Sequence, residues 1–269
     1  MNDDFIAGNA VVKRGRIAES GEQIRLAISF LTIIPVINGA RASDEKAVAA
    51  SFGWFPLVGF GIGAALCVED LALGYVFSPA IRSALIVMTL AIVTGALHLD
   101  ALADTADALG AGRDRARALE ILRDPRIGSF GAIALFFALA LKVLALVRLA
   151  GAMRFAAIYL APGLARYAMV MVAHGLEYMR TEGAGAALLA SSDDDHERRG
   201  SNELIACATV VIAVLPAISI KALCACVIAM VATLVLRAFY QRWIGGVTGD
   251  LIGAAGEIVE TAVLITFAT

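Results

Sequence analysis

The stretch GALHLDALADTADALGAGRDRARALEILRDPRIGSFGAIALFF, which runs from Gly95 to Phe137, begins and ends in apolar sequence. Between these ends it carries aspartates at 100, 104 and 107 and, behind them, five arginines. Charged side chains are costly inside a bilayer. The stretch therefore predicts two membrane helices that meet at an aqueous face, and the charge between them calls for a role.

The composition agrees with a membrane protein. Of the 269 residues, 60% are hydrophobic and 17% are charged, and the mean hydropathy is +0.81. Repeated apolar runs predict an all-α, polytopic integral membrane helical bundle, because no segment alternates as a membrane barrel does. Residues 1–23 are interpreted as a cytoplasmic N-terminal tail, and 24–269 as a single transmembrane domain. The net charge of −2 gives no reason to expect a nucleic-acid partner.

The apolar runs predict about seven transmembrane helices. A shorter segment precedes them at 24–37; it runs into Pro35, which suggests a re-entrant or interfacial helix instead of a span. The seven predicted spans are 53–77, 81–100, 131–150, 155–175, 204–220, 222–236 and 246–267.

The distribution of lysine and arginine predicts the orientation. Basic loops stay in the cytoplasm, and a single topology places every basic cluster there. It puts the end of the Asp100 helix, the arginine loop and the start of the last helix at the cytoplasmic face of the inner membrane. The residues counted are Lys13, Arg14, Arg16, Arg25, Arg113, Arg115, Arg117, Arg123, Arg126, Arg180, Arg198, Arg199, Arg237 and Arg242.

Three carboxylates share a narrow stripe when the opening stretch is projected on a helix. At about 100° per residue, Asp104 falls about 40° from Asp100, and Asp107 about 20° to the other side. His98 points roughly opposite. Like charges this close call for a compensating cation, and Mg²⁺ is the default for oxygen ligands. The alternative is a helix end that has emerged into water, with solvated aspartates.

A second acidic stripe lies in GGVTGDLIGAAGEIVETAV near the C-terminus. Asp250 and Glu257 are seven residues apart, about 20° offset, with Gly246 and Gly253 on the same side. Acidic residues in a membrane helix usually face a polar cavity or a partner. The glycines would let another backbone or a bulky ligand approach. The alternative is close helix packing, with Glu257 paired to an arginine.

Between the stripes, RDPRIGSFG offers cations and a helix start. Arg123, Asp124 and Arg126 precede a turn at Gly128 and Ser129 that leads into the next helix. Arginines beside backbone N–H groups at a helix start make a phosphate site. Carboxylates for Mg²⁺ beside such a site are typical of phosphoryl transfer. The alternative is that the arginines serve topology alone.

Lys142, Arg148 and Arg166 are basic residues inside predicted spans. Lys142 and Arg148 would either extend toward the interface or pair with a carboxylate. Arg166 lies midway along its span and needs a partner, for which we name Glu257.

Four ordered motifs resemble the cobalamin synthase family, also called adenosylcobinamide-GDP ribazoletransferase. The resemblance covers most of the chain. Ala101 and Ala108 stand where the family usually has glycine, and Pro125 where it usually has serine, but every carboxylate is in place. The motifs are FPLVGFGIG at 55–63, HLDALADTADAL at 98–109, LEILRDPRIGSFG at 119–131 and GGVTGDLIGAAGEIVE at 245–260.

The resemblance implies a Mg²⁺-dependent membrane enzyme with small-molecule substrates. It would join adenosylcobinamide-GDP to α-ribazole or its 5′-phosphate and release GMP. The sequence leaves a homo-oligomer open.

Carried onto this chain, the resemblance implies roles for twelve residues. The aspartates would hold Mg²⁺ on the pyrophosphate, and one of them would take the proton of the attacking hydroxyl. His98 is equally a catalyst or a packing residue. The catalytic and metal set is Asp100, Asp104, Asp107 and Asp250; the substrate-binding set is Arg123, Asp124, Arg126, Gly128, Ser129, Thr248, Glu257 and His98.

Two other classes of protein are considered. A CDP-alcohol phosphotransferase would use similar aspartates, but its signature places an Ala-Arg pair between them. No such pair lies between Asp100, Asp104 and Asp107. A cation-coupled transporter would want its carboxylates near the bilayer midplane, with routes to both sides. The predicted topology instead places the acidic stripes at one face.

Overall fold

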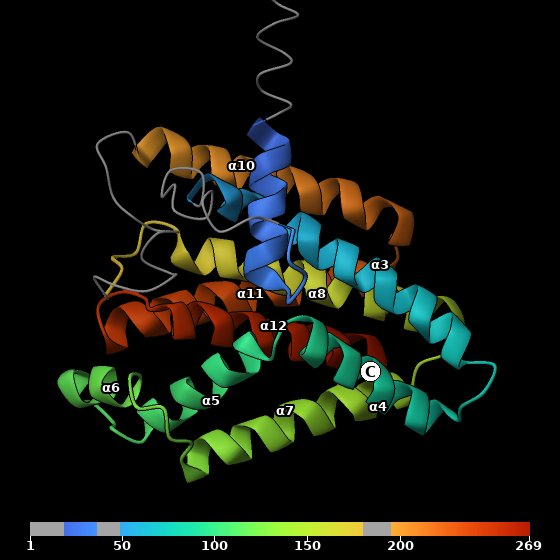
Figure 1. The fold of residues 1–269 in the computed structure, drawn as a ribbon, viewed down its shortest axis with the longest axis horizontal. Helices are drawn as coiled ribbons and strands as arrows, with labels where there is room; N and C mark the ends of the chain where they lie inside the picture. The colour runs from blue at the N-terminus through green and yellow to red at the C-terminus, as the bar shows by residue number, and fades with distance from the viewer. Residues whose placement is uncertain (1–18, 37–48, 180–194) are drawn as a thin grey trace, which may run out of the picture.

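The computed structural model describes residues 19–36, 49–179 and 195–269. The described chain is a helical bundle whose only strand-like pairing is a single bridge between Tyr178 and Val247 (Figure 1). A helix at 19–31 comes first. The helices that follow are α3 (Phe55–Leu73), α4 (Pro79–Val93), α5 (Leu97–Leu109), α6 (Arg115–Ile121), α7 (Ser129–Val147), α8 (Gly151–Ala173), α10 (Asp195–Val214), α11 (Ile220–Trp243) and α12 (Gly249–Ala268).

The protein is a polytopic helical membrane protein, with fewer full-length spans than seven. In the described part of the chain, five helices are long and apolar enough to cross a membrane, or six if the bent pair α4–α5 counts as one span. The apolar helix nearest to the predicted span 204–220 runs over Ser201–Ala217 and is shorter than the helices counted as candidate spans. It closes in a single tight turn at Leu215–Ala217. The helix at 19–31 is not among the candidate spans, as its length suggested.

The predicted span 81–100 is not one straight helix. Its two parts, α4 and α5, meet at an angle of 89°. Gly95 and Ala96 both adopt the left-handed region, with φ of 59° and 54°, which an L residue such as Ala96 enters at a cost. The Thr94 hydroxyl donates back to the Leu90 carbonyl at 2.9 Å, and the Ile33 amide donates to the Val93 carbonyl at 2.8 Å. The Ile33 bond satisfies the Val93 carbonyl at the break, whereas the Leu90 carbonyl also accepts the Thr94 amide at 3.1 Å.

The FPLVGFGIG motif packs α3 against α8. A Cβ added at Gly59 would collide with the Pro162 carbonyl, and one added at Gly63 with the Tyr159 carbonyl. Lipid offers no hydrophobic drive for helix association, so close backbone approach at small residues supplies the contact. Gly61, between them in the sequence, has no atom near its missing Cβ.

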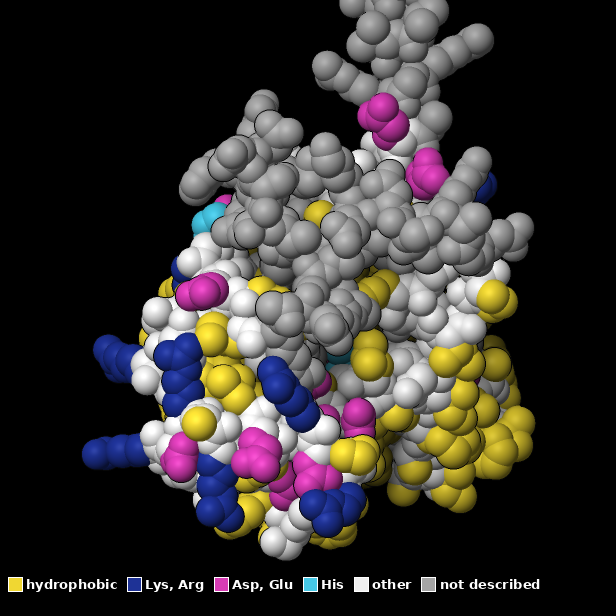
Figure 2. Space-filling model, turned by 60° about the vertical axis from the view of Figure 1, so that its left-hand side comes forward, with side chains coloured by type: hydrophobic (Ala, Val, Ile, Leu, Met, Phe, Trp, Pro, Cys, Tyr) yellow, Lys and Arg dark blue, Asp and Glu magenta, His cyan; other side chains and the backbone are white. Residues whose placement is uncertain are grey.

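One end of the bundle collects the charged loops (Figure 1, left). The Trp243 indole at the end of α11 donates to the Gly112 carbonyl after α5 at 3.0 Å, and Val247 bridges to Tyr178 after α8. We call this end, residues 100–131 and 243–250, the mouth. Figure 2 shows acidic and basic side chains gathered there and apolar side chains on the flank beside it. The exposed apolar side chains Phe136, Leu144, Val231 and Leu234 form part of the lipid-facing surface.

Part of the basic pattern behind the predicted orientation lies outside the described residues. This holds for residues 1–18 of the predicted tail, including Lys13, Arg14 and Arg16, and for Arg180, while the side chains of Arg198 and Arg199 are not described. The arginines of the loop between α5 and α7 and Arg242 of α11 lie at the mouth. Their common location is what the predicted topology requires.

We predict that substitution by alanine destabilises the protein at Gly59 and Gly63 of α3 but not at Gly61 between them. Gly59→Ala and Gly63→Ala would push α3 from the α8 backbone and lower the free energy of unfolding by about 1–3 kcal/mol. Gly61→Ala is the matched control and leaves stability unchanged or higher, because alanine favours a helix. Thermal unfolding in detergent measures this; equal midpoints for all three variants would contradict the packing.

Candidate active site

The carboxylates of α5 lie beside the first turn of α12. Asp100 is exposed, whereas Asp104 and Asp250 are half-buried. The two helices run in opposite directions (Figure 1) and touch closely where Gly253 meets Ala101, since a Cβ on Gly253 would come within 2.7 Å of the Ala101 methyl. Asp104 and Asp250 each stand one turn from this contact, toward the mouth. The structure therefore brings Asp104 and Asp250 to the same level of the α5–α12 pair.

Asp107 is engaged differently. Its two carboxylate oxygens accept from the backbone amides of Gly128, at 2.7 Å, and Gly131, at 2.9 Å. A Cβ on either glycine would collide with this carboxylate. A carboxylate suits a helix N-terminus, where amide donors lack partners within the helix. Asp107 thus binds the start of α7, where the sequence predicted phosphate at Gly128 and Ser129, and each of its oxygens accepts one backbone hydrogen bond there.

We predict that Asp107→Asn lowers stability more than Asp100→Asn does. The amide loses the charge and one of two acceptors at the start of α7, which should cost about 1–2 kcal/mol. Exposed Asp100 is the matched control because it makes no such bonds to α7. Thermal unfolding in detergent provides the comparison, and equal midpoints would remove Asp107 from its capping role.

Asp124 and Arg126 form an exposed pair in the loop before α7. Arg126 donates its backbone amide and Nε to Oδ1 of Asp124, at 3.1 and 2.9 Å, and a terminal nitrogen to Oδ2 at 2.6 Å. These side-chain and backbone hydrogen bonds lower the pKa of Asp124 to about 2 and raise that of Arg126. Asp124 therefore holds the Arg126 guanidinium in a fixed direction, while Arg123 is exposed beside it.

We predict that this pair persists through the physiological pH range. The folded pKa of Asp124 lies below its ordinary value of 3.8, so the pairing is complete at neutral pH and is lost only as pH falls through about 2. Carbon NMR of the labelled Asp124 carboxyl should give a midpoint near that value, and Arg126→Gln should return it toward 3.8. An Asp124 titration midpoint that does not change in Arg126→Gln would contradict the pairing.

The predicted metal ligands are not gathered in one cluster. Among the described residues, no group of three or more histidine, cysteine, aspartate or glutamate side chains is placed to hold a metal ion. Asp107 is committed to α7. Asp100 and Asp104 on adjoining turns of α5, and Asp250 at the start of α12, supply carboxylate oxygens, which are the donors that Mg²⁺ prefers. The residues thus suit Mg²⁺ in chemistry but with fewer protein ligands than the sequence suggested.

Thr248 and Glu257 take positions inside the protein. Thr248 is buried and caps α12, its hydroxyl accepting from the Leu251 amide at 3.3 Å. Glu257 is 5% exposed and pairs with Lys142 at 2.5 Å. Lys142 therefore pairs with a carboxylate, whereas Arg166 binds Glu260 at 2.6 Å and not Glu257 as named from the sequence.

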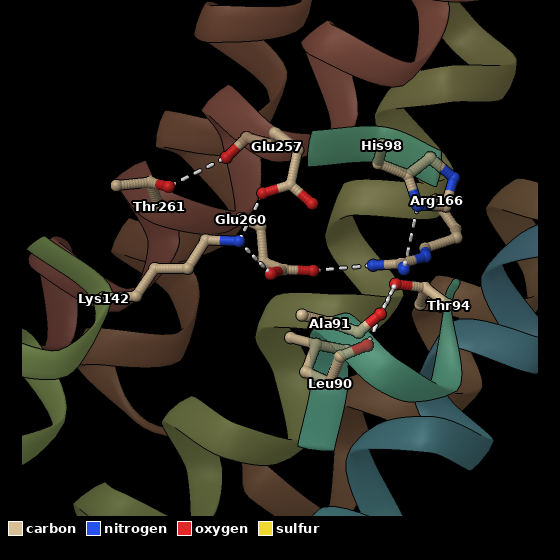
Figure 3. Close-up of polar contacts among 9 residues, drawn as sticks. All are labelled: Leu90, Ala91, Thr94, His98, Lys142, Arg166, Glu257, Glu260 and Thr261. Carbon is tan, nitrogen blue, oxygen red and sulfur yellow. Dashed lines mark hydrogen bonds and ion pairs between the residues drawn. The ribbon is translucent and has the colours of Figure 1, made fainter. Parts of the chain in front are cut away.

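Glu260 completes a set of buried polar residues that the sequence interpretation missed. Lys142 also reaches it at 2.5 Å, and His98 faces Arg166, with Nδ1 3.5 Å from a guanidinium nitrogen (Figure 3). The available signal was the spacing of Glu257 and Glu260, which places both carboxylates on neighbouring positions of one helix face. We call His98, Lys142, Arg166, Glu257 and Glu260 the buried ionic cluster.

The fold and the mouth define a polytopic membrane protein with carboxylates and arginines gathered at one end of its bundle. Residues 23–268 match the family described as cobalamin-5-phosphate synthase. The chain belongs to this family.

Relatives named adenosylcobinamide-GDP ribazoletransferase cover nearly the same length. The protein of Syntrophobacter fumaroxidans is 37% identical over 88% of this chain and 94% of its own. That of Desulforamulus reducens is 36% identical over 90% and 94%, and that of Stutzerimonas stutzeri 38% identical over 90% and 96%. No solved structure matches the chain. The family selects the transferase over the two other classes of protein considered.

Proposed function

We propose that this chain joins adenosylcobinamide-GDP to α-ribazole or its 5′-phosphate and releases GMP, in a late step of cobalamin synthesis. The observation that carries the proposal is that Asp104 on α5 and Asp250 on α12 lie at the same level of a close helix contact, at the end of the bundle that carries the exposed arginines. Phosphoryl transfer needs oxygen ligands near the pyrophosphate and cations on the departing phosphate. The names and full-length similarity of the relatives support the same reaction.

The reaction forms one phosphorus–oxygen bond and breaks another. A ribose hydroxyl of α-ribazole attacks the phosphorus attached to the cobinamide arm, and the bridging oxygen leaves with GMP. Either Asp104 or Asp250 accepts the hydroxyl proton as the bond forms. Arg123 and Arg126 bind the departing phosphate, and the bonds from Asp124 keep Arg126 in place.

Mg²⁺ belongs to this proposal as the expected cofactor. Asp100, Asp104 and Asp250 would hold it, and when bound it neutralises charge on the pyrophosphate oxygens. Asp107 keeps its place at the start of α7, so that the arginine loop and the α5 carboxylates remain side by side.

The proposal also places the mouth in the cytoplasm, in a multi-pass inner-membrane protein. Five arginines lie between α5 and α7, and Arg242 lies at the end of α11. Such an excess of positive charge is retained on the cytoplasmic side. Both substrates would then reach the mouth from the aqueous phase, beside the lipid-facing flank.

We predict that Asp104→Asn abolishes most of the activity. Loss of a carboxylate that binds metal or takes the proton should lower kcat for GMP release by about 100-fold or more. Glu120→Gln on α6 is the control, because it makes the same chemical change at an exposed position of the same end. GMP release with and without Mg²⁺ is measured on folded, reconstituted protein. Full activity of Asp104→Asn would refute the site.

A further inference from the structure

The buried ionic cluster joins four helices inside the bundle. Lys142 comes from α7, Arg166 from α8, Glu257 and Glu260 from α12, and His98 from α5 (Figure 3). Each of these residues is at most 5% exposed. The two cations and the two carboxylates balance, so the cluster is neutral with an uncharged imidazole. A neutral group in which each charge has an opposite partner is tolerated in a membrane interior, where a single charge is not.

The chemistry of the contact fixes the imidazole tautomer. A guanidinium can only donate, so Nδ1 of His98 must accept from Arg166, and the proton resides on Nε2. In the described structure Nε2 is buried without a hydrogen-bond partner. Leaving a donor unpaired is costly, and Arg166 is already held by Glu260. The contact between Nδ1 of His98 and Arg166 therefore holds His98 in this position, and it connects α5 to the ion pair between α8 and α12.

This contact lies in the first turn of α5, where Gly253 of α12 also packs closely against His98 and Ala101. The helix begins directly after the left-handed corner at Gly95 and Ala96, so its first turn has no straight helix behind it. Its other end is held by Asp107 against the start of α7. Asp100 and Asp104 lie between these two attachments. Together with the Ala101–Gly253 contact, the Arg166 contact therefore positions α5 against α12, and with it Asp104 relative to Asp250.

We propose that His98 and Arg166 are positioning residues for the transfer reaction: through Glu260 and Lys142 they align the α5 carboxylates with Asp250. The inference rests on the proposed function, because the aligned carboxylates are those of the proposed site. Neither residue touches substrate. Displacement of catalytic groups by about 1 Å costs roughly 100-fold in rate, so loss of the contact between His98 and Arg166 acts on kcat.

A second buried pair provides a matched control for stability. Arg154 of α8 is 2% exposed and binds Asp70 of α3 through two nitrogens, at 2.9 and 2.6 Å. Arg82 also pairs with Asp70, at 3.2 Å, so Arg154→Gln leaves that carboxylate compensated. This pair tethers α3 to α8 and makes no contact with α5. The Arg154→Gln variant therefore shows how the loss of a buried ion pair that does not involve α5 affects stability and activity.

The experiment compares three variants of the full chain in lipid vesicles with the unaltered protein. His98→Leu removes the acceptor, His98→Asn supplies a side-chain oxygen near the position of Nδ1, and Arg154→Gln is the control. We measure kcat and KM for GMP release, and hydrogen exchange of the α5 amides. We expect His98→Leu to lose roughly 10-fold to 100-fold in kcat with KM within about 2-fold, and to exchange faster in α5. His98→Asn should recover most of the rate, and Arg154→Gln should keep both kcat and α5 protection.

The proposal is overturned if His98→Leu keeps its kcat, if His98→Asn fails to recover it, or if Arg154→Gln lowers it equally. Failure of the proposed function gives a different result, because the unaltered protein would then release no GMP. In that case hydrogen exchange decides alone. Faster exchange of α5 in His98→Leu but not in His98→Asn supports the positioning role of His98, and unchanged exchange in both overturns it.

Discussion

The neutral pairing of Lys142 and Arg166 with Glu257 and Glu260 is the contact on which the bundle depends. Each charge would be unstable alone in the membrane interior, and removal of one partner from such a group costs about 3–5 kcal/mol. Because the partners come from α7, α8 and α12, their need for compensation fixes those three helices relative to one another. His98 then attaches α5 to the same group. The need to compensate each buried charge thus determines how α5, α7, α8 and α12 are placed relative to one another.

The mouth shows that similar carboxylates serve different purposes according to their surroundings. Asp107 is bonded to two amides of α7 and joins the helices. Asp104 and Asp250 are level with each other across the Ala101–Gly253 contact, where we place the chemistry. Between α5 and α7, Asp124 directs Arg126. The structural carboxylates hold the proposed reactive ones and the arginines at the same end of the bundle.

Local periodicity was sufficient to predict part of this arrangement. The aspartates of α5 are on one helix because their spacing follows 3.6 residues per turn, and the arginines gather at one end because charge avoids hydrocarbon. The 89° break was not predictable in the same way, since Thr94, Gly95 and Ala96 contain no proline and the bond from the Ile33 amide to the Val93 carbonyl arises from packing. The roles of Asp107 and Glu260 depend on partners 21 to 118 residues away, which no helical projection contains.

A structure of the protein with Mg²⁺ and adenosylcobinamide-GDP bound, determined by cryo-electron microscopy in a lipid disc, tests the account most directly. The account predicts the pyrophosphate between Asp104 and Asp250, the guanosine phosphate near Arg123 and Arg126, and the buried ionic cluster unchanged. A pyrophosphate bound at the opposite end of the bundle, near Asp70 and Arg154, or a cluster taken apart by the substrate, would contradict it.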